Sequence, residues 1–128
     1  MSAPAPVLTR DALAAARAMA RLNAHVKSDD RLRDQVYRLK TRLTRALYMA
    51  GYCTGAMPEG RRGTETLRFG FDIAGERFQW HQRARAVDWD VALGSVDHRG
   101  TWEPRARLNA SEFRLAVRAV WAYLDRVE

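Results

Sequence analysis

Three residues near the middle of the chain, His81, Asp88 and Asp90, have side chains suited to acid–base or metal chemistry. Histidine exchanges protons near neutral pH, and alternate residues of one strand project to the same side, so Asp88 and Asp90 would present paired carboxylates. Such a group could serve a small metal-dependent hydrolase. The spacing, however, matches no catalytic or metal-binding motif. The sequence therefore predicts no catalytic residue, no metal and no other cofactor.

The segment that carries these residues has the alternating pattern of β-strands. Apolar residues occupy every second position over 67–73, again over 77–81 after the Ala74–Gly75 turn, and again over 87–93. The parity of the apolar positions changes between residues 82 and 86, which indicates a turn or a bulge there. We therefore expect an antiparallel three-stranded meander with one buried face.

A register that keeps the apolar residues together pairs Phe71 with Phe78 and Phe69 with Trp80. On the opposite face it aligns Arg68, His81 and Asp88 in one row, places Gln79 beside Asp90, and places Asp72 beside Arg77. The simplest interpretation is a solvated face whose opposite charges attract one another. If a partner covers that face instead, its charges and Trp102 of the following loop would set specificity.

Three segments have helical periodicity: 9–26, 29–49 and 109–127. Thr9 is the expected N-cap of the first helix, whose alanine-rich face suits a homodimer seam as readily as an internal contact. Asn109 and Glu112 have the spacing of a capping box at the start of the last helix. Four glycines and a proline over 51–65 indicate a loop.

These elements predict an α+β fold, a two-layer domain in the order α-α-β-β-β-α with the helices packed on one face of the meander. The length of 128 residues is that of one domain. We expect a flexible N-terminal tail over 1–8 and a single globular domain over 9–128.

The second helix also carries an arginine-rich face. Its arginines fall within about 60° of one another on a helical wheel, away from the apolar stripe, and span about 21 Å. They are Arg31, Arg38, Arg42 and Arg45, and the loop that follows adds Arg61 and Arg62. Forked guanidinium donors on such a face suit a nucleic-acid backbone or an acidic protein surface. The competing interpretation is an ordinary solvated helix face.

The formal net charge of +7 favours phosphate-rich or acidic partners. Twenty arginines stand against two lysines, a bias that a G+C-rich coding sequence also produces. The single cysteine excludes an internal disulfide and fits a cytoplasmic protein. No apolar run is long enough to span a membrane.

The sequence thus favours a small non-enzymatic protein of bacterial or phage type that binds nucleic acid or a nucleoprotein complex through the arginine-rich helix. The first alternative is an adaptor or inhibitor, of phage or mobile-element type, that binds a protein through the charged sheet face and the Trp102 loop. The second alternative is the hydrolase built on His81, Asp88 and Asp90.

Overall fold

The computed structural model describes residues 6–26, 30–58, 66–83 and 107–128. Within these residues it has three α-helices and a three-stranded antiparallel sheet in the order α-α-β-β-β-α, which confirms the predicted α+β fold. The elements are α1 (Pro6–Val26), the short 3₁₀ helix η1 (Asp30–Leu32), α2 (Arg33–Met49), β1 (Cys53–Pro58), β2 (Thr66–Ile73), β3 (Glu76–Arg83) and α3 (Ala110–Val127).

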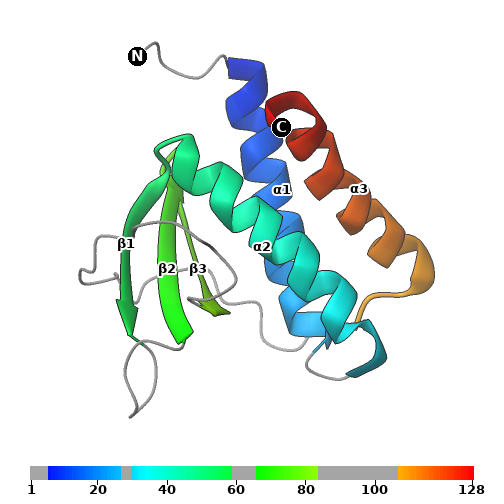
Figure 1. Cartoon of the computed structure of the whole chain (residues 1–128). Coiled ribbons are helices and arrows are strands. Elements are labelled where there is room, and N and C mark those ends of the chain that lie inside the picture. Colours follow the sequence, from blue (N-terminus) through cyan, green and yellow to red (C-terminus); the bar gives the residue numbers. More distant parts are fainter. Residues whose placement is uncertain (1–5, 27–29, 59–65, 84–106) are drawn as a thin grey trace.

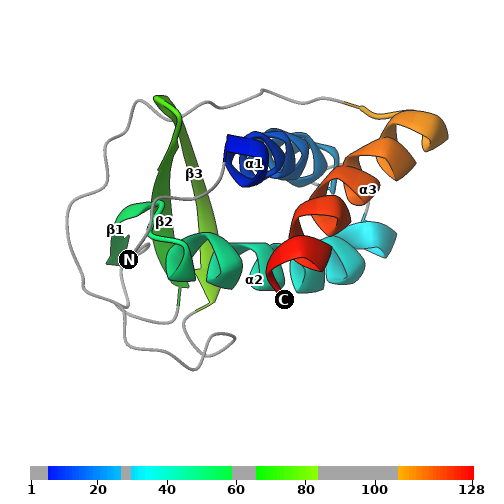
Figure 2. The same ribbon diagram turned by 90° about the horizontal axis from the view of Figure 1, so that it is seen from above.

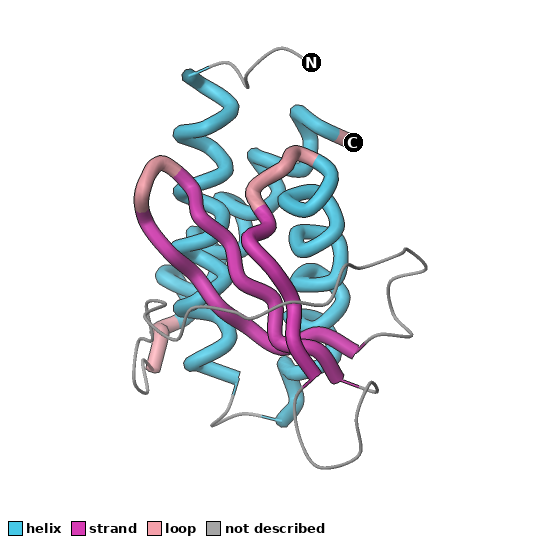
Figure 3. Tube along the Cα trace, turned by 90° about the vertical axis from the view of Figure 1, so that its left-hand side faces the viewer, coloured by secondary structure: helices cyan, strands magenta, loops and turns pink. Residues whose placement is uncertain are grey.

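The helices all lie on one face of the sheet (Figures 1 and 3). Helices α1 and α2 contact the strands directly, and α3 packs on α1 and α2. Seen from above, α3 lies on the side of these two helices that is away from the sheet (Figure 2). Within the described parts of the chain, no helix combines the length and the apolar character that crossing a membrane requires.

Helix α1 lies at the centre of the molecule, since α2, α3, β2 and β3 all contact it. Its small residues Ala12, Ala15 and Ala16 are fully buried, as are Met19 and Leu22. Alanine buries little area itself, but it lets neighbouring backbones approach closely. The alanine face is therefore an internal contact of this chain and does not offer a homodimer seam.

Strands β2 and β3 form the hairpin that the alternation of apolar residues predicts. Phe71 pairs with Phe78 and Phe69 with Trp80, so the predicted register is confirmed. All four aromatic residues are buried against the helices. The buried face is thus the helix-facing side of the sheet.

One described strand of the sheet was not predicted from the sequence. Strand β1 occupies Cys53–Pro58, inside the segment predicted to be a loop, and pairs with β2. The pattern was misleading because Gly55 and Pro58 weaken strand propensity, and only Ala56 of this irregular edge strand is buried. The strand predicted over 87–93 lies outside the described residues.

The structure tests the N-terminal caps that the sequence predicted for α1 and α3. Asn109 Oδ1 accepts from the Glu112 backbone N–H at 2.8 Å, and Glu112 Oε1 accepts from the Asn109 backbone N–H at 3.1 Å, so the capping box of α3 is confirmed. Thr9 is not a cap: α1 begins three residues earlier, at Pro6, a residue whose fixed φ suits a first helical turn. The Thr9 hydroxyl instead lies 3.3 Å from the Tyr52 hydroxyl.

Candidate functional site

The outward side of η1 and α2 carries several arginines. The four arginines predicted to share this side are all exposed, and we call them the arginine face: Arg31 of η1 and Arg38, Arg42 and Arg45 of α2. The opposite side of the helix packs into the core through Val36, Leu43 and Leu47. The helical period therefore both anchors α2 and directs these guanidinium groups to solvent.

One member of the arginine face is held by α3. The Arg42 guanidinium lies 5.3 Å from the centroid of the Trp121 ring and 3.4 Å from a carboxylate oxygen of Glu128. Trp121 is 39% exposed, so its indole is an accessible aromatic surface beside the arginines. Trp121 was not among the site residues predicted from the sequence. The sequence pattern that could have identified it is its position at the edge of the apolar face of α3.

Several carboxylates of the described residues pair with arginines outside the arginine face. Glu76 binds Arg17 at 2.6 Å, Glu112 binds Arg21 at 3.1 Å, and Asp11 binds Arg126 at 2.7 Å. These pairs join α1 to β3 and to α3. Helix α2 itself carries the acid Asp34, and Glu128 lies beside Arg42.

The polar face of the sheet is the second candidate surface. Arg68 lies directly opposite His81, as predicted, and Asp72 lies opposite Arg77 with 3.8 Å between charged atoms. The remaining predicted site residues, Asp88, Asp90 and Trp102, lie outside the described residues, as do Arg61 and Arg62 of the loop. The structure therefore brings Arg68 and His81 together and leaves the hydrolase and adaptor hypotheses as predictions.

This sheet face is not uniformly solvated. His81 and Arg77 are exposed, whereas Gln79, between them on the same strand, is only 6% exposed. Among the described residues, neither amide atom of Gln79 has a hydrogen-bond partner. The expectation that water covers the whole face is therefore wrong at this position.

Catalytic and metal chemistry gain no support from the described residues. Within them, no group of three or more His, Cys, Asp or Glu side chains is arranged to hold a metal ion. Burial raises the pKa of the Cys53 thiol, and a backbone hydrogen bond with Gly55, which lowers this pKa, is the smaller effect. A thiol with a raised pKa is mostly protonated at neutral pH, which is unfavourable for a nucleophile.

Comparison with protein-family models, with curated proteins and with solved structures found no match to this chain.

Proposed function

We propose that this protein binds nucleic acid, alone or within a nucleoprotein complex, through the arginine face of η1 and α2. The observation that carries the proposal is the common exposure of Arg31, Arg38, Arg42 and Arg45 on one side of η1 and α2. No catalytic step is part of the proposal. A cytoplasmic location is part of it, because the single cysteine indicates no dependence on disulfides.

The dimensions of the arginine face suit a nucleic-acid backbone. From Arg31 to Arg45 the helix rises about 21 Å, the length of roughly six base pairs at about 3.4 Å each. Guanidinium groups present several donors in a fixed plane and bind phosphate oxygens in pairs. Contacts of this kind fix position on the backbone and carry no base preference.

Trp121 adds a second kind of contact next to the arginines. Proteins that bind single strands combine a positive groove with aromatic rings on which bases stack. The Trp121 ring is partly exposed and lies against Arg42. This pairing supports the proposal, because a base of a nucleic acid could stack on the ring while the arginines contact the phosphates.

The test is fluorescence anisotropy with a labelled duplex DNA and a labelled single-stranded RNA, each of about 20 nucleotides, at about 0.1 M salt. The variant Arg38→Gln/Arg45→Gln removes two exposed arginines that have no ion-pair partner among the described residues. We expect its affinity for both ligands to fall about tenfold, because two phosphate contacts are lost.

The matched control is Arg10→Gln/Arg118→Gln, which removes the same two charges from exposed positions on α1 and α3. Its affinity should stay within about twofold of the parent, since binding would depend on placement and not on total charge. Equal losses in the two variants, or no binding of either nucleic acid by the parent, would overturn the proposal.

A further inference from the structure

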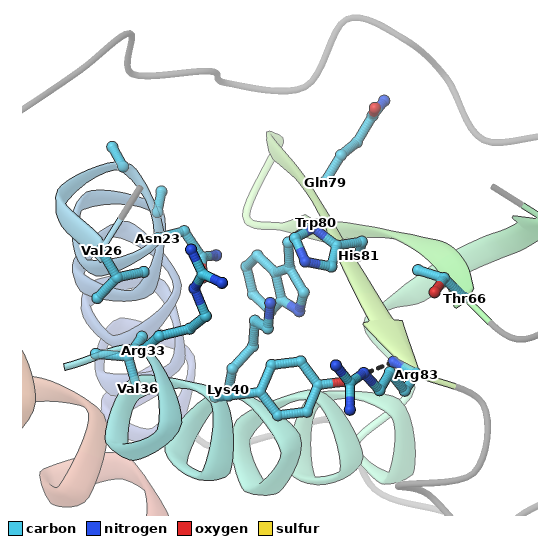
Figure 4. Close-up of a pocket in the computed structure, with 13 residues that line it drawn as sticks. Asn23, Val26, Arg33, Val36, Lys40, Thr66, Gln79, Trp80, His81 and Arg83 are labelled. Carbon is cyan, nitrogen blue, oxygen red and sulfur yellow. Dashed lines mark hydrogen bonds between the residues drawn. The ribbon is translucent and has the colours of Figure 1, made fainter. Parts of the chain in front are cut away.

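The positive side chains of α2 fall on two sides of the helix. Lys40 is only 3% exposed and lines, with Arg33 and Arg83, a cavity of about 410 Å³ that α2 shares with α1, β2 and β3. Figure 4 shows Arg33 and Lys40 extending from α2 toward Trp80. These two residues are thus set apart from the arginine face. The arginine face adjoins α3 instead, whose last turns lie beside α2 (Figure 2).

Trp121 of α3 provides an aromatic ring at the edge of the arginine face. The Arg42 guanidinium lies over this ring and also binds the Glu128 carboxylate. Val120 and Leu124, which are close to Trp121 in the sequence, are fully buried, so this turn of α3 is anchored in the core. The ring and the guanidinium are therefore held together before any ligand binds, which lowers the entropic cost of binding.

Two other arginines flank this pair. Arg38 lies four residues before Arg42 and Arg45 three residues after it, and both are exposed. Arg42 already has a carboxylate partner, which leaves Arg38 and Arg45 as the better phosphate contacts. They are separated by about 10 Å of helix rise, the length of roughly three stacked nucleotides at about 3.4 Å each. A strand that contacts both arginines would therefore have a base between them, beside the Trp121 ring.

Stacking on Trp121 would distinguish the two forms of nucleic acid. In a duplex each base is paired and stacked between its neighbours, so a helix that lies along the backbone contacts phosphates and sugars. In a single strand the bases can turn outward and stack on aromatic rings or on guanidinium planes. The Trp121 ring would thus add to the binding of a single strand and not to that of a duplex.

We propose that the arginine face and Trp121 form a site for single-stranded nucleic acid. One base stacks on the Trp121–Arg42 pair, and Arg38 and Arg45 contact the phosphates on either side of it. The single-strand site rests on the function proposed above and adds to it the form of nucleic acid that is preferred.

The test compares three labelled ligands of one sequence by fluorescence anisotropy: a single-stranded RNA of about 20 nucleotides, the single-stranded DNA and the DNA duplex, at about 0.1 M salt. The parent should bind at least one single strand about fivefold or more tightly than the duplex, because a stacked base adds to the phosphate contacts. Trp121→Leu keeps an apolar side chain and removes the ring. Its affinity for that single strand should fall about tenfold, and its affinity for the duplex should stay within about twofold of the parent.

Two control variants test whether the ring acts by stacking. Trp121→Phe keeps an aromatic ring and should retain most of the single-strand affinity. Leu115→Gln removes a side chain that is 61% exposed on the same helix, about 120° from Trp121 on a helical wheel, and should bind as the parent does. The single strand should also quench the tryptophan fluorescence of the parent more than that of Trp121→Phe.

Either of two results would overturn the single-strand site: duplex binding by the parent at least as tight as that of both single strands, or equal effects of Trp121→Leu on single strand and duplex. The function proposed above would still stand if Arg38→Gln/Arg45→Gln bound the duplex more weakly than Arg10→Gln/Arg118→Gln. Absence of binding to all three ligands would overturn both.

Discussion

Ala74 adopts a left-handed backbone conformation, with φ of 54°, in the turn between β2 and β3. Gly75 follows with φ of 85°, and its backbone N–H donates to Asp72 Oδ1 at 3.0 Å. Two successive residues with positive φ are typical of the type I′ turn, in which asparagine and glycine are the favoured pair. Ala74 is therefore strained, whereas Gly75 adopts a positive φ without strain.

The variant Ala74→Asn should therefore be more stable than the parent. Asparagine tolerates the left-handed region better than alanine, and we expect the free energy of unfolding to rise by about 0.5–1 kcal/mol. Urea unfolding followed by circular dichroism measures the change. Gly75→Ala is the converse control and should lower stability, since it introduces a side chain at positive φ. An unchanged or lower stability of Ala74→Asn would contradict the strain.

At the residue scale, the exposure and pairing of a residue could be predicted from the sequence where they depend on one helix or one hairpin alone. The exposure of the arginine face followed from the helical period, and the Arg68–His81 pair followed from strand register. The burial of Lys40 could not be predicted in this way. That burial depends on α1 and β3, whose positions relative to α2 no local pattern specifies.

At the element scale, α2 is joined to β3 by a row of polar contacts. The Trp80 indole N–H donates to Thr44 Oγ1, and Gln82 Nε2 donates to Thr41 Oγ1 at 2.7 Å and to the Tyr37 hydroxyl at 3.2 Å. The residues Thr44 and Gln82 are fully buried. These contacts fix the angle of α2 on the sheet and thereby the direction of the arginine face.

Replacing Thr44 by valine tests this interface, because valine keeps the shape and removes the acceptor. The buried indole N–H would lose its partner, and we expect the free energy of unfolding to fall by about 1–3 kcal/mol. Thr41→Val is the matched control: Gln82 Nε2 would keep the Tyr37 hydroxyl, so the loss should be smaller. Equal losses in thermal or urea unfolding would argue against this role for Thr44.

The sequence predicted elements well where large apolar residues recur at a clear period. The β2–β3 hairpin and the three helices have that pattern, and the Asn109–Glu112 capping box marks the start of α3. Strand β1 has no such pattern, since a bulge between Cys53 and Gly55 interrupts its pairing. Its hydrogen bonds to β2 come from tertiary placement, which local propensity does not reveal.

At the scale of the whole molecule, charge is distributed unevenly. The ion pairs Arg17–Glu76 and Arg126–Asp11 lie between elements, whereas the outward side of α2 keeps its arginines toward solvent. Exposed ion pairs of this kind contribute little to stability. The cavity lined by α1, α2, β2 and β3 was not predictable, because its walls combine helices and strands that are distant in sequence.

The salt dependence of DNA binding tests the central claim most directly. Each phosphate that a protein neutralises contributes about −0.9 to the slope of log K against log salt concentration. If Arg38 and Arg45 each contact a phosphate, the Arg38→Gln/Arg45→Gln variant should have a slope shallower than the parent by about 1.8, while Arg10→Gln/Arg118→Gln keeps the parent slope. Anisotropy titrations over a series of NaCl concentrations measure both. Identical slopes for the parent and Arg38→Gln/Arg45→Gln would contradict binding of nucleic acid through the arginine face.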